Sequence, residues 1–158
     1  MNQSMQASIA RAPYRAALVV FAVVLAVYVW TLAPTVTFWD AGEFIAAAKI
    51  LGIPHPPGTP LFILMGNVWG MLVPIGEFAY RTNLMTAVFS AAAAALMFLL
   101  IAQALRGWKL EGGGGALARA AADPVYWVGG DAAAAGLSAF VFTVWQNSNE
   151  TEVYMVAA

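Results

Sequence analysis

Long stretches without ionisable side chains alternate with short polar segments along this chain. Residues 16–34 and 82–105 contain no Asp, Glu, Lys, Arg or His, and each is long enough to cross the roughly 30 Å hydrocarbon layer of a bilayer as a helix. A third stretch, rich in alanine, covers residues 125–146. The pattern predicts an all-α integral membrane protein with three transmembrane helices, at 16–34, 82–105 and 125–146.

The alternative for the first stretch is a cleavable signal peptide, because Arg11 and Arg15 precede it. The apolar run is longer than the core of a typical signal peptide, and no Ala-x-Ala cleavage site follows it at the right distance. We therefore favour an uncleaved first span.

Residues 61–75 are apolar but contain Gly66, Asn67 and Gly70. So short a segment is more typical of an interfacial or re-entrant helix than of a span. If it does not cross, five cationic residues (Arg11, Arg15, Arg106, Lys109 and Arg119) lie on one side of the membrane and two (Lys49 and Arg81) on the other. A fourth span would divide the seven Lys and Arg residues almost evenly between the two sides, so the positive-inside rule favours three spans.

The three-span topology divides the remaining chain into loops. It predicts a cytoplasmic N-terminus at 1–15, a first extracytoplasmic loop at 35–81 with interfacial helices at 38–51 and 60–75, a cytoplasmic Gly-rich loop at 106–124, and the start of a second extracytoplasmic segment at 147–158. The expected location is a membrane, specifically a bacterial inner membrane.

The composition agrees with a membrane protein and excludes several kinds of site. Hydrophobic residues make up 62% of the 158 residues and charged residues 9%, whereas roughly a quarter of the residues of a soluble domain are charged. With a net charge of −1, the chain has no basic surface for nucleic acid. The absence of cysteine excludes disulfides, thiolate nucleophiles and thiolate metal sites.

The acidic residues of the first loop are candidates for catalysis. Asp40 and Glu43 are three residues apart, so they lie on one face of the helix predicted at 38–51, with Thr37 as its expected N-cap. The alternative is that Asp40 only completes the first helical turn by accepting from free N–H groups. The spacing by itself leaves both interpretations open.

Two cationic side chains of the same loop are candidates for binding an anion. His55 lies among four prolines, Pro54, Pro56, Pro57 and Pro60, which hold the backbone in a stiff, extended path. Arg81 is at the start of the second span, where it can bind a phosphate group or anchor lipid headgroups.

These motifs together resemble a known superfamily. Residues 39–43 (Trp-Asp-Ala-Gly-Glu) followed by 55–58 (His-Pro-Pro-Gly) are similar to the first extracytoplasmic loop of GT-C glycosyltransferases, which use polyprenyl-phosphate sugars. Residues 31–40 and Glu152-Val153-Tyr154 resemble the protein O-mannosyltransferase-like family first catalogued as a domain of unknown function, which includes an animal O-mannosyltransferase of plexin-type receptors.

The resemblance implies a reaction and a set of roles. A first-loop carboxylate, here Asp40, takes the proton from an acceptor hydroxyl of a protein or glycan, and the sugar is transferred from its lipid phosphate with inversion. Glu43 would support Asp40, whereas His55, Arg81, Glu152 and Tyr154 would contribute to substrate binding. Some superfamily members hold a divalent cation on their acidic residues and others need none, so the resemblance leaves a metal open.

The chain is shorter than such transferases and ends in an apolar run, Met155-Val156-Ala157-Ala158, without a helix stop signal. We expect an N-terminal fragment that is inactive in isolation, whose parent acts among membrane lipids. Two alternatives are a transporter or lipid-handling protein and a truncated, non-catalytic membrane subunit.

Overall fold

The computed structural model of the chain describes residues 13–37, 40–55, 59–110 and 124–151. Within these ranges it is all-helical, without strands. The helices in chain order are α2 (Tyr14–Trp30), α3 (Ala41–Ile50), α4 (Pro60–Leu72), α5 (Phe78–Leu110), α7 (Pro124–Ala139) and α8 (Phe142–Ser148).

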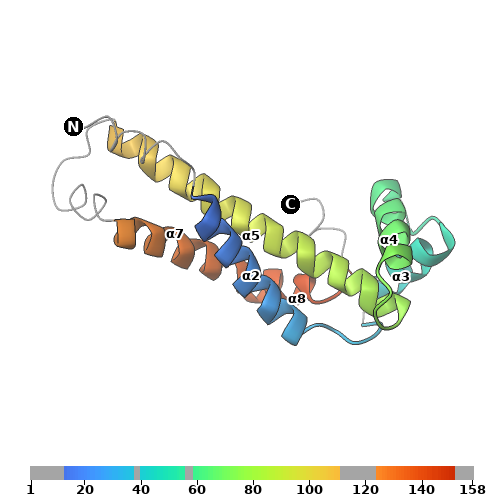
Figure 1. Ribbon diagram of the computed structural model, residues 1–158. Helices are drawn as coiled ribbons and strands as arrows, with labels where there is room; N and C mark the ends of the chain where they lie inside the picture. Colours follow the sequence, from blue (N-terminus) through green and yellow to red (C-terminus); the bar gives the residue numbers. More distant parts are fainter. Residues whose placement is uncertain (1–12, 38–39, 56–58, 111–123, 152–158) are drawn as a thin grey trace.

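Three helices form an elongated bundle. The long helix α5 runs its whole length, with α2 antiparallel to it and α7 alongside (Figure 1). Small and apolar residues fill the core. They are Val24 and Tyr28 of α2, Leu32 just after it, Ala87, Ala91 and Ala94 of α5, and Ala139 of α7. The alanines allow close helix approach, as expected where apolar helices pack through small residues.

The third predicted helix, 125–146, is divided into α7 and α8 at Phe140 and Val141. The buried hydroxyl of Tyr28 donates to the Ala139 carbonyl at 2.6 Å, so this carbonyl has a partner outside its own helix. Val141 has an extended backbone (φ −58°, ψ 135°). The Tyr28 hydrogen bond therefore satisfies a polar group at the point where the helix is interrupted.

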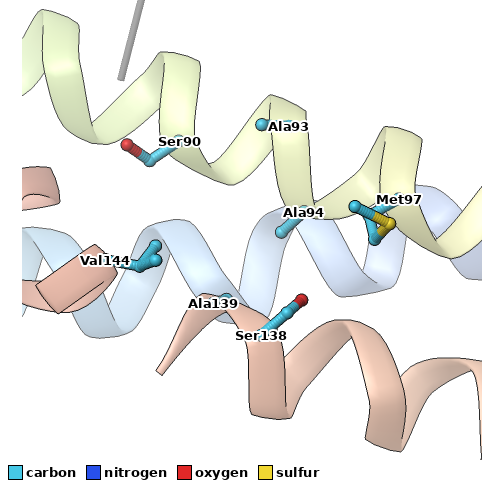
Figure 2. Close-up of a pocket in the computed structure, with 7 residues that line it drawn as sticks. All are labelled: Ser90, Ala93, Ala94, Met97, Ser138, Ala139 and Val144. Atoms are coloured by element: carbon cyan, nitrogen blue, oxygen red, sulfur yellow. The ribbon is translucent and has the colours of Figure 1, made fainter. Parts of the chain in front are cut away.

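A small open cavity of about 190 Å³ lies beside this interruption. Figure 2 shows its lining from three helices: Ser90, Ala93, Ala94 and Met97 of α5, Ser138 and Ala139 of α7, and Val144 of α8. None of the candidate site residues that the structure describes contributes to it.

Helices α3 and α4 lie apart from the bundle, at the end where α5 begins (Figure 1). Phe44, Ala47 and Ala48 of α3 pack against Phe62 and Ile63 of α4 and Met85 of α5. Close contacts tie α4 in place: a Cβ at Gly66 would lie 3.1 Å from the Cβ of Ala48, and one at Gly70 would overlap the Phe78 ring. The short helices are thus rigidly attached to the first turns of α5.

Among the described residues, one helix has the length and apolar composition of a membrane span, Phe78–Ala104 of α5. Helices α2 and α4 are apolar but shorter, at 17 and 13 residues. Thirteen residues extend about 20 Å as a helix, which is less than the roughly 30 Å hydrocarbon layer. Helix α4 is thus too short to cross, and since only α5 meets both criteria among the described residues, three spans stay a prediction.

We expect Gly70→Ala to destabilise the α4–α5 contact, because the new Cβ would lie 2.9 Å from Cδ2 and Cζ of Phe78. Overpacking of this kind costs roughly 1–3 kcal/mol. The control is Gly129→Ala in α7, where a new Cβ meets nothing within 4 Å. Thermal unfolding in detergent should show a lower midpoint for Gly70→Ala only; equal midpoints would contradict the described packing.

Candidate functional site

The N-terminus of α3 presents the two acidic residues of the first loop. Asp40 precedes the helix as its N-cap, and its backbone carbonyl accepts from the Phe44 N–H at 3.0 Å. Its side chain makes no capping hydrogen bond, so the expected bonds from the free N–H groups of the first turn to this carboxylate are not formed. The expected N-cap, Thr37, lies outside the helix, and its hydroxyl has no hydrogen-bond partner among the described residues.

The other end of α3 is held by α4. The buried amide of Asn67 donates to the Ala48 carbonyl at 2.8 Å and to the Lys49 carbonyl at 3.4 Å, where the helix leaves carbonyls unpaired. Leu51 then adopts a left-handed conformation (φ 55°), and the Gly52 N–H donates to the Ala47 carbonyl. Because both its C-terminus and its inner face are fixed, α3 holds its acidic residues in a defined place.

Glu43 binds His55 through both carboxylate oxygens. Its Oε1 accepts from the His55 backbone N–H at 2.6 Å, and its Oε2 lies 2.9 Å from Nδ1 of the imidazole. The ring also packs at a tilt against Phe44, with centroids 5.8 Å apart. Glu43 therefore attaches the proline-rich segment to the first turn of α3.

This pair shifts the acid–base equilibria of both side chains. The hydrogen bonds from His55 hold the pKa of Glu43 below its ordinary value of 4.5. The hydrogen bond to Glu43 and its charge, with a smaller contribution from the charge of Asp40, raise the pKa of His55 above 6.5. Both shifts favour a carboxylate paired with an imidazolium.

The sign of each shift gives the pH range in which the pair contributes to stability. The contribution of Glu43 is present above pH 4.5 and is lost as the pH falls through its lowered pKa. The contribution of His55 is present below pH 6.5 and is lost as the pH rises through its raised pKa. The Glu43–His55 pair therefore contributes most to stability between pH 4.5 and pH 6.5.

Asp40 completes a cluster with this pair. One potential ligand atom from each of Asp40, Glu43 and His55 lies within 4.8 Å of the others, and all three residues are exposed. The structure thus brings the two acids and the histidine together. Among the described residues, no hydrogen bond engages the Asp40 carboxylate, so it can accept a proton or hydrogen bond from a bound molecule.

Arg81 lies in the first turn of α5 and binds backbone carbonyls. Its Nη1 donates to the Gly70 carbonyl at 2.8 Å, and its Nη2 and Nε donate to the Gly76 carbonyl at 2.8 and 3.1 Å. These bonds join the end of α4 to the start of α5. No described contact links Arg81 to the acidic cluster, and its predicted phosphate contact stays a prediction.

Glu152 and Tyr154 lie outside the described residues, but the segment just before them is anchored. Thr151 donates to the buried side chain of Asn83 in α5 at 2.5 Å. Asn83 also donates to the Ala33 carbonyl, which places the end of the described chain beside the start of the first loop. The role of Asn83 was not predicted from the sequence; the signal for it was an amide within an apolar span.

Comparisons with known proteins agree with these motifs. Residues 40–158 match the family described as the N-terminal domain of protein O-mannosyl-transferase TMEM260. The chain is 37% identical over 142 residues to protein O-mannosyl-transferase TMEM260 of Mus musculus, covering 89% of this chain and 17% of the relative. It is 31% identical over 77 residues to the tmem260 transferase of Dictyostelium discoideum, covering 48% and 9%. The chain thus spans less than a fifth of these relatives. No solved structure matches it.

The Glu43–His55 pair makes a spectroscopic prediction, since His55 is the single histidine of the chain. In lipid nanodiscs, an NMR titration of the imidazole should give a pKa above 6.5 in the wild type. Glu43→Gln should lower this pKa toward its ordinary value because the carboxylate partner is lost. Glu77→Gln, at another exposed acid, is the control and should leave it unchanged. A wild-type value at or below 6.5 would exclude the pair.

Proposed function

This chain belongs to the family of protein O-mannosyl-transferase TMEM260 N-terminal domains, and on that premise we propose that it supplies catalytic residues to a membrane glycosyltransferase. The proposed reaction moves a sugar, mannose by analogy with the names of the relatives, from a polyprenyl phosphate to an acceptor hydroxyl such as a protein Ser or Thr. One observation carries the proposal: the exposed Asp40 carboxylate, without a described hydrogen bond, lies beside the paired Glu43 and His55.

Asp40 is the general base in this proposal. It takes the proton of the acceptor hydroxyl while the hydroxyl oxygen bonds to the anomeric carbon, and the bond from that carbon to the phosphate oxygen breaks on the opposite face. The sugar configuration inverts and the lipid phosphate leaves with the bonding electrons. Glu43 is less suited to be the base, because its two oxygens already accept from His55.

His55 is placed to stabilise the leaving phosphate. Glu43 occupies Nδ1 and favours the protonated ring, so Nε2 is the nitrogen left to donate to an anion. A cationic donor at the departing phosphate lowers the energy of the transition state as charge develops there. In the proposal Arg81, Glu152 and Tyr154 complete the binding of donor and acceptor.

A divalent cation is compatible with the same cluster. Asp40, Glu43 and His55 offer the mixed oxygen and nitrogen ligands that several divalent metals accept. Bound there, a cation would supply charge stabilisation at the phosphate.

The topology that we propose places this cluster outside the cytoplasm. The N-terminus is cytoplasmic, α2, α5 and the α7–α8 segment cross the membrane, and α4 lies at its surface among the lipids. Helix α4 supports this arrangement because Leu61, Leu64, Val68, Met71 and Leu72 are all exposed and the helix contains no charged residue. The predicted bacterial inner membrane has no support from the relatives, which are eukaryotic.

Asp40→Asn tests the base. The substitution preserves size but removes the proton acceptor, so in the complete gene product kcat for sugar transfer should fall by roughly 100-fold or more. Transfer is measured with a radiolabelled polyprenyl-phosphate sugar in membranes. Glu77→Gln is the matched control for loss of an exposed carboxylate and should keep the wild-type rate. Wild-type transfer by Asp40→Asn would show that this carboxylate is not the base.

Cysteine labelling tests the topology, because this chain has no native cysteine. A cysteine in place of Glu150 should react with a membrane-impermeant maleimide from the extracytoplasmic side of sealed membranes. A cysteine in place of Lys109, in the predicted cytoplasmic loop, should react only after the membrane is opened. Protection at position 150 in sealed membranes would refute the three-span topology.

A further inference from the structure

Asn83 has every polar atom of its side chain engaged. It lies in the second turn of α5 and is fully buried. Its Nδ2 donates to the carbonyls of Ala33 and Thr35 at 2.9 and 3.1 Å, and its Oδ1 accepts from the Thr151 hydroxyl at 2.5 Å. These bonds reach two segments that are far apart in the sequence and that belong to no helix.

A second set of bonds joins the same two segments directly. The Ala33 N–H donates to the Asn149 carbonyl at 3.1 Å, and the Thr31 hydroxyl lies 3.0 Å from Oδ1 of Asn149. The Asn149 amide in turn donates to the Trp145 carbonyl in α8. Asn83, Asn149 and Thr151 are buried, and buried amide and hydroxyl groups are costly to leave unpaired. The network therefore favours one arrangement of 31–35 against 149–151.

The network is adjacent to the proposed site on the chain. Thr35 precedes Asp40 by five residues. Arg81, two residues before Asn83, donates to a carbonyl at the end of α4. Helix α4 holds α3 through Asn67. The first two turns of α5 therefore fix the chain on both sides of Asp40: Asn83 before it and Arg81, through α4, after it.

We propose that Asn83 is a positioning residue for sugar transfer, which holds the segment leading to Asp40 in register with the segment ending at Thr151. This inference rests on the proposed function. Asn83 touches neither Asp40 nor the reacting atoms; it acts by fixing the backbone that carries the base. Small displacements of a catalytic group lower the rate of the chemical step more than they lower substrate binding.

Two variants and one matched control test the inference in the complete gene product. Asn83→Asp preserves shape but replaces the amide by a carboxyl group, which cannot donate to both the Ala33 and the Thr35 carbonyl in either protonation state. Thr151→Val preserves shape but removes the hydroxyl that donates to Asn83. Thr86→Val is the control: its hydroxyl is equally buried, but its bond is to the Thr82 carbonyl within α5.

Hydrogen–deuterium exchange in lipid nanodiscs reports on the attachment itself. In both test variants the peptide covering residues 31–37 should exchange faster, because the bonds that order this segment are weakened. The Thr86→Val protein should exchange like the wild type in this peptide. Unchanged exchange in folded Thr151→Val would overturn the inference whether or not Asn83→Asp folds.

Steady-state kinetics separate positioning from a merely structural role. For Thr151→Val we expect kcat per folded molecule to fall roughly 10- to 100-fold with little change in KM for the donor, and wild-type values for Thr86→Val. Faster exchange with unchanged kcat and KM would overturn the positioning role. If Asp40→Asn loses transfer while Thr151→Val keeps it, this inference alone fails; if Asp40→Asn retains transfer, the proposed function fails.

Discussion

The structure depends on one constraint: side chains in the first turns of α5 hold the end of α4 and the segment that follows α2. Within three residues, Arg81 binds the carbonyls that end α4, and Asn83 binds the carbonyls that follow α2. These carbonyls lie where helices end and cannot be paired within a helix. Side chains of α5 provide the partners, so one helix both forms the bundle and orients the loop that carries the acidic cluster.

The division of work between the two acids follows from this arrangement. Glu43, in the first turn of α3, is committed to His55 and attaches the proline-rich segment. Asp40, just before the helix, is left with an open carboxylate. Two residues of like chemistry, three apart, thereby acquire different environments, and the proposed function assigns the reacting role to the one that is left open.

Several features were predictable from the sequence because they depend on local pattern. The apolar runs led to α2 and α5. The spacing of Asp40 and Glu43 led to their proximity, although Asp40 precedes α3 instead of lying in it. The proline cluster predicted a held histidine, which stays a prediction for the prolines themselves. The bond from His55 to Glu43 was not predicted, since Glu43 is twelve residues away. The helix predicted at 125–146 is divided into α7 and α8, and Tyr28, in a different helix, donates to the Ala139 carbonyl beside the interruption.

The sequence by itself determined the helical class, the apolar character and the residue types available for chemistry, because periodicity and composition act over a few neighbouring residues. The tertiary structure decided which of those residues meet: Glu43 with His55, Arg81 with the end of α4, and Asn83 with Ala33 and Thr151. These contacts depend on which helices pack together and at what distance. Hydrogen bonds between buried groups distant along the chain leave no periodic trace in the sequence.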